Sequence, residues 1–341
     1  MSETIAAALE AYLRKRLFAR DLQVCGLERI HGGASRETYR FLARYGEGER
    51  QVERKLILRR DPPASLIETD RAREFRAYEA FHALGLPVPE PVLLEPDGGA
   101  LERPFFIMSE IEDAAAASVL APDPYGPQRD AIGLQFWSVL GRIARADPIA
   151  LDLGDFDGST ERDACWRNEL ARWERVIDAD EDEPQPIVRA AIRWLKRRPP
   201  APAQKISLVH GDYRSGNFLW SADGGIRAIL DWEMAHLGDP LEDLGWALDP
   251  LWAHHDPSRP GGMLPRAEAI AIWERESGLI ADSDALRWWE IFASVKGAAI
   301  WISAAHEFAT GRNDDPVNAF SGWYCLAFHN KLLADRLEAL A

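Results

Sequence analysis

Cysteine, long apolar runs and excess positive charge are all scarce in this 341-residue sequence. The three cysteines, Cys25, Cys165 and Cys325, form no CxxC pair, which argues against a disulfide framework or a zinc site. No stretch approaches the ~18 uninterrupted apolar residues of a membrane span, and the polar first residues lack the pattern of a secretory signal. These absences predict a cytoplasmic protein with reduced thiols and no membrane partner.

The charge of the chain is acidic and unevenly distributed. There are 55 acidic and 40 basic residues, which give a formal net charge of −15, while a hydrophobic share of 47% excludes a disordered chain. Residues 1–109 carry 17 charges of each sign, so the whole excess falls on residues 110–341. An acidic balance argues against nucleic acid as a partner, because nucleic acid binds clustered Lys and Arg. The asymmetry predicts two unlike domains, 1–109 and 110–341.

Residues 1–109 contain short strand patterns separated by turn residues, together with two helical patterns. The strand patterns cover 22–30, 38–43, 52–58, 92–94 and 104–108. The helical patterns cover 5–17 and 66–84, and the second lies between the third and fourth strands. This order predicts an α+β unit, a small antiparallel sheet with one inserted helix.

The remainder of the chain has mostly helical periodicity. The predicted helices cover 128–144, 161–176, 187–196, 267–276, 284–308 and 317–340. Two short strand patterns, 206–209 and 226–230, interrupt them and flank a loop with unusual chemistry. An acidic run at 178–183 is predicted to be a solvated loop.

That loop reads HGDYRSGN at residues 210–217, and the second strand pattern ends in Ile-Leu-Asp at 229–231. Asp212 and Asn217 lie five residues apart, and Asp231 emerges at the end of the strand. Oxygen ligands from two segments suit Mg²⁺, so Asn217 and Asp231 are the predicted metal ligands. Asp212 is then left to accept a proton as the catalytic base. One base and two Mg²⁺ ligands are what phosphoryl transfer from ATP requires.

The spacing His-x-Asp-x-x-x-x-Asn is that of the kinase catalytic loop. Its form here, together with Gly-Asp-Pro-x-x-Asp-Leu at 238–244, resembles the aminoglycoside phosphotransferase/choline kinase-like family over about residues 25–330. Within that family the sequence looks most like the branch found beside acyl-CoA dehydrogenases. The resemblance implies a bilobal protein-kinase-like fold, with an N-terminal antiparallel sheet lobe and a larger, mainly helical C-terminal lobe. It also implies ATP and Mg²⁺ as cofactors.

The resemblance further implies a set of nucleotide-binding residues in the first domain. Gly33 and Ser35 stand in the loop that would cover the nucleotide. Arg59 occupies the position where the antibiotic-resistance enzymes have a phosphate-pairing Lys, and it keeps the charge with a different geometry. Glu74 is the expected helix partner of Arg59, although surface helix pairs with Arg71 or Tyr78 are the alternative.

The connection between the two domains implies the adenine site. By resemblance, the backbone of Ser109, Glu110 and Ile111 would hydrogen-bond to the adenine edge, and Met108 would be either the back of the pocket or plain core.

In the second domain, Asp243 is expected to brace the 210–217 loop through backbone N–H groups or Arg214. His210 is expected to be an anchor of that loop rather than the base.

These features predict an ATP- and Mg²⁺-dependent small-molecule kinase that phosphorylates a hydroxylated substrate. Two alternatives stay open: a kinase for an acyl-CoA-related hydroxy acid, and a nucleotide-binding pseudokinase scaffold, which the Arg59 substitution favours. The acidic runs 178–183 and 239–249 have two interpretations: a negative field at the acceptor site that selects a cationic substrate, or an acidic surface that serves solubility. The sequence is compatible with either a monomer or a homodimer.

Overall fold

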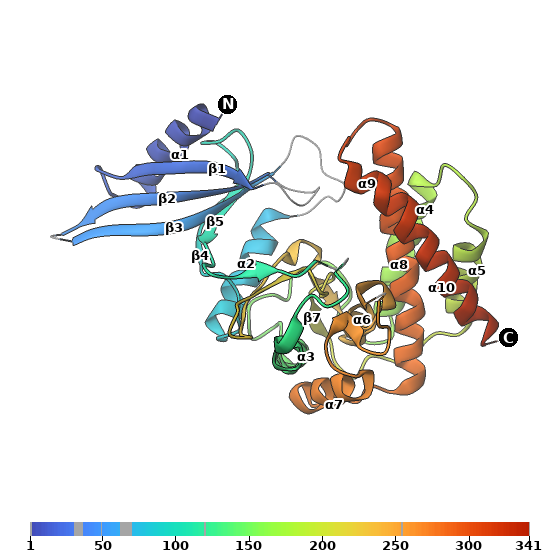
Figure 1. Cartoon of the computed structure of the whole chain (residues 1–341). Helices are drawn as coiled ribbons and strands as arrows, with labels where there is room; N and C mark the ends of the chain where they lie inside the picture. The colour runs from blue at the N-terminus through green and yellow to red at the C-terminus, as the bar shows by residue number, and fades with distance from the viewer. Residues whose placement is uncertain are drawn as a thin grey trace. The chain divides into compact units, whose positions relative to one another are not determined.

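A computed structural model describes residues 2–30, 37–48, 50–61, 70–118, 121–253 and 255–340. The chain divides into two compact units, Met1–Glu112 and Asp113–Ala341, shown in Figure 1. The first unit contains an antiparallel sheet and the second is mainly helical, so the predicted α+β class is confirmed.

The N-terminal unit is built on a five-stranded sheet with the order β1-β2-β3-β5-β4, in which all neighbours are antiparallel. Its strands are β1 (Gln23–Ile30), β2 (Glu37–Glu47), β3 (Arg50–Arg60), β4 (Pro91–Glu95) and β5 (Phe105–Ser109). All five strand patterns in the sequence therefore form strands. The central strand β3 lies between β2 and β5, and it carries Arg59.

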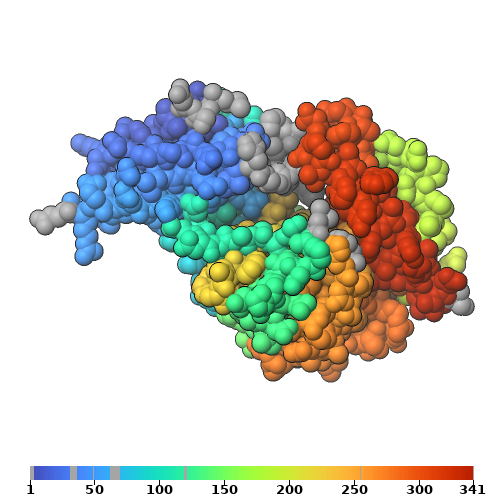
Figure 2. All heavy atoms as spheres, in the orientation of Figure 1, coloured from blue at the N-terminus to red at the C-terminus, as the bar shows by residue number. Residues whose placement is uncertain are grey.

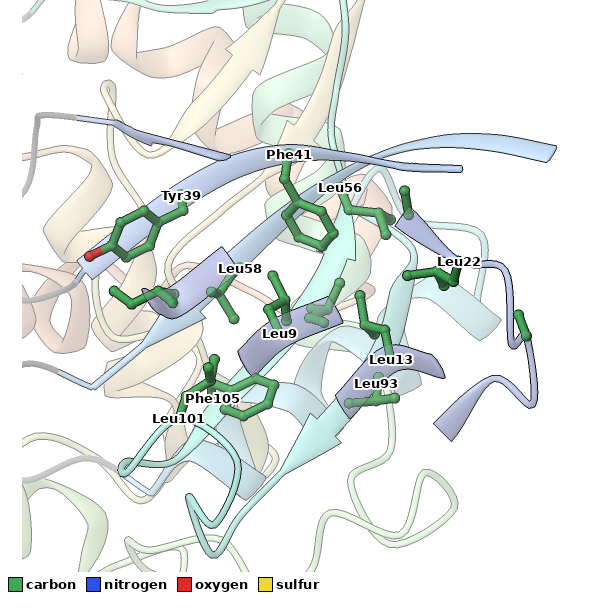
Figure 3. Close-up of a cluster of buried hydrophobic side chains, with 14 residues drawn as sticks. Leu9, Leu13, Leu22, Tyr39, Phe41, Leu56, Leu58, Leu93, Leu101 and Phe105 are labelled. Atoms are coloured by element: carbon green, nitrogen blue, oxygen red, sulfur yellow. The ribbon is translucent and has the colours of Figure 1, made fainter. Parts of the chain in front are cut away.

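Helix α1 (Ser2–Arg16) contributes to the core of this unit. Leu9 and Leu13, one helical turn apart, are fully buried, and Phe41 and Leu58 reach the same cluster from β2 and β3. Figure 3 shows these side chains converging between the helix and the strands. Each such side chain contributes roughly 1.5–3 kcal/mol through burial, so α1 is an integral part of the unit.

Helix α2 (Arg71–Ala83) is the inserted helix, and it begins later than the predicted residue 66. The Asp70 side chain accepts hydrogen bonds from the backbone N–H groups of Ala72 and Arg73, which fixes the helix start. Residues 62–69 lie outside the described part of the chain. The helix stops before Gly85, whose φ of +67° suits a residue without a side chain.

The C-terminal unit is organised around the long helix α8, which contacts α4, α5, α6, α9 and α10. Its helices are α3 (Arg129–Arg145), α4 (Cys165–Asp180), α5 (Pro186–Arg197), α6 (Leu241–Ala247), α7 (Arg266–Ser277), α8 (Ser283–Ala309), α9 (Pro316–Phe320) and α10 (Leu326–Glu338). Trp288, Trp289 and Phe292 of α8 are buried in the core. The single helix predicted over 317–340 is divided by a π-helical turn, Ser321–Cys325. In Figure 2 the red α9 and α10 lie at the surface of this unit.

Short strands and 3₁₀ turns make up the loop region of the same unit. The strands are β6 (Ala115–Ala116), β7 (Ser207–Val209), β8 (Phe218–Trp220), β9 (Ile226–Ile229) and β10 (His236–Gly238), and the 3₁₀ turns are Gly126–Gln128, Trp232–Met234, Pro250–Ala253 and Pro260–Gly262. They form two small sheets, β6-β8-β9 and β10-β7. The sequence predicted β7 and β9 and missed β6, β8 and β10, which have only two or three residues each.

The cysteines and the apolar helices bear on two expectations from the sequence, the lack of a disulfide framework and the lack of a membrane span. The three cysteines are free, and Cys165 is buried. Across the described ranges, no helix combines the length and the apolar character that a bilayer crossing requires.

Candidate functional site

The hairpin of β8 and β9 brings Asn217 and Asp231 to the same end of one small sheet. Phe218 pairs with Ile229, and the Leu230 N–H donates to the carbonyl oxygen of Asn217 at 2.9 Å. Asn217 immediately precedes β8, and Asp231 lies two residues after Ile229, the last residue of β9. The two predicted metal ligands are therefore adjacent in space although 13 residues lie between them in the chain.

Asp231 has an unusual backbone conformation, with φ +70° and ψ +56°. Outside glycine, left-handed residues are uncommon and cost about 1–3 kcal/mol, and they concentrate at functional sites. The 3₁₀ turn Trp232–Met234 starts directly after it, so the chain reverses sharply at this residue. This backbone places a carboxylate at the mouth of the hairpin.

Three side chains hold the carboxylate of Asp212. Arg214 Nε donates to both oxygens, at 3.0 and 3.2 Å, and Trp246 Nε1 donates to Oδ1 at 2.8 Å. Asn217 Nδ2 donates to Oδ2 at 2.5 Å and to the main-chain oxygen at 2.9 Å. The side chain is 17% exposed, so the carboxylate is fixed in direction and still reachable from solvent.

Asn217 also passes a simple test for a cation site. Because its Nδ2 faces two oxygens of Asp212, its Oδ1 points away from them and is the atom that can coordinate a cation. Together with the Asp231 carboxylate at the same hairpin end, this is the all-oxygen donor set that suits Mg²⁺. The residues present therefore fit the predicted ion.

The 210–217 loop is braced from behind by helix α6. The Asp243 carboxylate accepts hydrogen bonds from the N–H groups of His210 and Gly211, at 2.6 and 3.0 Å. Two kinds of partner were expected for Asp243: backbone N–H groups or Arg214. The structure shows the backbone N–H groups, and Arg214 contacts Asp212 instead. His210 Nε2 lies 2.9 Å from the Leu230 carbonyl, and burial lowers the pKa of this histidine. His210 is thus a buried anchor, as predicted.

In the N-terminal unit, Arg59 and Glu74 form the predicted ion pair, with Arg59 Nη1 3.2 Å from Glu74 Oε1. The alternative partner is present as well, because Arg71 contacts the other Glu74 oxygen. Both guanidinium groups lie over the ring of Phe106, at 5.9 and 5.5 Å from its centre. Glu74 is buried, so its carboxylate is matched by two cations within the unit.

The predicted adenine-binding backbone follows β5. The N–H of Ser109 donates to Glu90 O and the N–H of Glu110 donates to Lys55 O, so both amides already serve the sheet. The adenine contact predicted for 109–111 stays a prediction. Met108 is buried, which agrees with both of its predicted roles. Gly33 and Ser35 lie outside the described residues, and their role stays a prediction.

The acidic run 239–249 is not the surface feature that the sequence suggested. Asp239, Glu242, Asp243 and Asp249 are all buried and engaged by partners from other elements. Their carboxylates are buried and hydrogen-bonded, so these four acids do not supply an exposed negative face. The run 178–183 is also only partly a loop, because α4 continues to Asp180.

Sequence reasoning missed four buried residues near the loop: Trp246, Lys296, Glu242 and His236. Lys296 Nζ donates to the carbonyl of Gly211 at 2.6 Å and lies 3.0 Å from Glu242. One signal was available, because Lys296 is the only charged residue in the apolar stretch 291–305. A lone charge in such a stretch indicates a buried partner.

The sequence of this chain is similar to those of known proteins. The profile of a family described as "Phosphotransferase enzyme family" matches residues 26–279. Mouse acyl-CoA dehydrogenase family member 10 is 30% identical over 70% of this chain and 22% of its own length. Human acyl-CoA dehydrogenase family member 11 is 25% identical over 80% of this chain and 35% of its own length. The chain thus spans well under half of these relatives.

Solved structures show the same fold. A Ralstonia eutropha protein assigned as an aminoglycoside phosphotransferase has a TM-score of 0.74 at 22% identity, covering 97% of this chain and 98% of that one. Aminoglycoside phosphotransferase APH(4)-Ia, solved with ADP and hygromycin B, has a TM-score of 0.58 at 18% identity, with coverage of 97% and 98%. A choline/ethanolamine kinase family protein from Mesorhizobium loti has a TM-score of 0.57 at 16% identity, covering 98% of this chain and 95% of that one.

Proposed function

Because this chain belongs to the phosphotransferase enzyme family, we propose that it transfers the γ-phosphate of ATP, with Mg²⁺, to a hydroxyl group of a small molecule. The observation that carries the proposal is the convergence of Asp212, Asn217 and Asp231 at one end of the β8–β9 hairpin. A base and two oxygen ligands on separate segments are the parts that phosphoryl transfer needs.

Asp212 is the proposed base. Its carboxylate is oriented by three donors and remains partly exposed, which suits a group that must meet a substrate hydroxyl. As the hydroxyl oxygen attacks the γ-phosphorus, its proton passes to Asp212 and the bond to the ADP oxygen breaks. The competing candidate, His210, is buried, and its ring contacts the Leu230 carbonyl.

Asn217 and Asp231 are the proposed Mg²⁺ ligands, through Oδ1 and a carboxylate oxygen. Bound Mg²⁺ supplies positive charge next to the phosphate oxygens of the nucleotide. The protein's own contribution is to hold both side chains at the hairpin end, where the Leu230–Asn217 hydrogen bond fixes their separation.

Arg59 is proposed to contact the nucleotide phosphates, with Glu74 fixing its direction. Support comes from the 3.2 Å ion pair and from the solved relative that contains ADP. A guanidinium can meet two phosphate oxygens at once, so the change from Lys to Arg keeps the function and alters the geometry. Adenine is proposed to meet the backbone at 109–111.

The acceptor is proposed to be a small hydroxylated molecule. The relatives differ in what their names report: hygromycin B for one, choline or ethanolamine for another, and acyl-CoA for the curated proteins. An acceptor panel must therefore contain amino sugars, choline-like alcohols, hydroxyacyl-CoAs and plain sugars.

The proposal is tested by Mg-ATP consumption over this panel, with wild type and Asp212→Ala side by side. We expect Asp212→Ala to lower turnover by about 10²–10⁴-fold with one acceptor class. Asp223→Ala is the matched control, because Asp223 is an acid in the exposed turn of the same hairpin. If wild type and Asp212→Ala both stay at background while nucleotide still binds, the pseudokinase alternative is correct.

A further inference from the structure

Two side chains from outside the 210–217 loop reach it from helices α6 and α8. Trp246 of α6 donates its indole N–H to Asp212 Oδ1 at 2.8 Å. Lys296 of α8 donates from its ammonium group to the carbonyl of Gly211 at 2.6 Å. Both side chains are 1% exposed. Asp212 is therefore held at its carboxylate and at the peptide unit that precedes it.

The ammonium group of Lys296 lies beside a cluster of buried acids and one histidine. Its ammonium lies 3.0 Å from Glu242, whose other oxygen lies 3.1 Å from His236, and Glu169 is 3.8 Å from the same ring. The ligand atoms of the two acids and the histidine lie within 4.8 Å of one another, a spacing also found in metal sites. Here two carboxylates are already matched by an ammonium and an imidazolium.

Trp246 differs from the other two side-chain donors to Asp212 in the element that carries it. Arg214 and Asn217 belong to the same loop as Asp212, so they move whenever the loop moves. Trp246 lies in a buried helix, where its ring packs 5.1 Å from Trp252 and 5.3 Å from the Lys296 ammonium. It is the donor that connects the carboxylate to the core of the unit.

We propose that Trp246 and Lys296 are positioning residues for Asp212, so that α6 and α8 set the direction of the base. The inference rests on the proposed function, in which Asp212 receives the substrate proton. A proton acceptor must be held within about 0.5 Å and 10–20° of its working geometry. Neither residue contacts a substrate; both act through Asp212 and its preceding peptide.

Trp246→Phe is the sharpest test, because it removes one N–H and keeps an aromatic ring. We expect kcat to fall about 10- to 100-fold, the value of a hydrogen bond to a charged group, with KM for ATP nearly unchanged. Trp288→Phe is the matched control: Trp288 is also buried, and its N–H donates to a backbone carbonyl, Leu195 O, at 3.2 Å. Equal losses in both variants would overturn the proposal.

A double-mutant cycle separates positioning from general damage to the fold. In an Asp212→Ala background, Trp246→Phe should have no further effect on the residual rate, because the group it holds is gone. If Trp246→Phe lowers the rate equally in both backgrounds, it does not act through Asp212 and the proposal is wrong.

Lys296→Met alone can fail to fold, since it leaves Glu242 without its cation. The double variant Lys296→Met/Glu242→Gln removes one charge of each sign, and Gln can still contact His236. We expect it to recover much of the lost thermal stability while kcat stays at least about tenfold below wild type. Full recovery of kcat would show that Lys296 serves charge balance alone, against the proposal.

A measurement that needs no turnover separates this inference from the proposed function. The Trp246 indole N–H signal in ¹⁵N NMR should shift and exchange faster with solvent in Asp212→Ala, whereas the Trp288 signal should not change. An unaffected Trp246 signal would overturn the positioning contact. If the signal shifts in Asp212→Ala but the wild-type protein has no detectable kinase turnover, the contact is supported and the proposed function is refuted.

Discussion

Asn217 donates from its single amide nitrogen to two oxygens of Asp212, the carboxylate Oδ2 at 2.5 Å and the main-chain carbonyl at 2.9 Å. This relationship connects the proposed base with a proposed metal ligand. Because the Nδ2 of this side chain faces Asp212, its Oδ1 points away from the proposed base, and Asp231 lies at the same end of the β8–β9 hairpin. In the proposed function, one residue would therefore couple proton acceptance with cation binding.

Replacing Asn217 should consequently harm both steps. In Asn217→Ala we expect the Mg²⁺ concentration for half-maximal activity to rise about 10- to 100-fold, because an oxygen ligand and the orientation of Asp212 are lost together. Titrating Mg²⁺ at saturating ATP measures this shift. Asn330→Ala is the control, since Asn330 makes one helical side-chain bond in α10. An unchanged Mg²⁺ requirement would remove Asn217 from the metal site.

Arg59 should act through nucleotide affinity. Arg59→Ala is expected to raise KM for ATP by about 10- to 100-fold, because a charge-assisted contact to phosphate is lost. Arg59→Lys should recover part of this loss, since the charge returns without the fork geometry. The control is Arg60→Ala: Arg60 follows on the same strand, on the other face of the sheet, and pairs with Glu37. Equal KM changes at 59 and 60 would contradict a phosphate contact.

The sequence was sufficient to predict the parts of the fold that depend on local pattern. Alternating apolar residues located all five strands of the N-terminal sheet, and the spacing within 210–217 identified Asp212 and Asn217 as neighbours. The start of α2 was placed too early, because the apolar periodicity in the sequence begins before Asp70, the residue that caps the helix. The short strands β6, β8 and β10 were missed because two or three residues carry little periodicity, although β7, with three residues, was predicted.

Contacts that no local rule connects could not be predicted. Trp246 lies 34 residues from Asp212, and Lys296 lies 85 residues from Gly211. The acidic run 239–249 was misjudged for the same reason, because composition does not tell whether an acid has a buried partner. Asp249 illustrates this: it accepts from Ser294 and His329, both from distant helices.

Gly211 offers a test of how tightly the loop is packed. Its φ is +84°, and a Cβ at this position would lie 2.4 Å from the Met234 carbonyl oxygen. Gly211→Ala should lower the free energy of unfolding by about 2 kcal/mol or more, through backbone strain and a clash with rigid backbone. Gly278→Ala is the control, because its φ is similar, +73°, but no atom lies within 4 Å. Measured by denaturant unfolding, Gly278→Ala should lose less of the free energy of unfolding, about 1 kcal/mol. Equal losses in the two variants would mean that the 210–217 loop can move away from Met234.

The stability of the C-terminal unit should depend on pH through His236. Burial disfavours protonation of this side chain, but the carboxylates of Glu169 and Glu242 outweigh burial and raise the pKa of His236 to about 9. Because this pKa lies above the ordinary value of about 6.5, the stabilisation is fully present below pH 6.5 and is lost as the pH rises through 9. Unfolding measured between pH 6 and 10 should show this decline, worth up to roughly 3 kcal/mol.

His236→Gln isolates the contribution of this one group, since every other titrating side chain is shared with wild type. The variant leaves two carboxylates with the single cation of Lys296, so it should be less stable than wild type at pH 6.5. Above pH 9 the wild-type imidazole is neutral too, and the difference between the two unfolding curves should shrink. A constant difference from pH 6 to 10 would mean that His236 is neutral in the folded protein, and that the buried acids are balanced in another way.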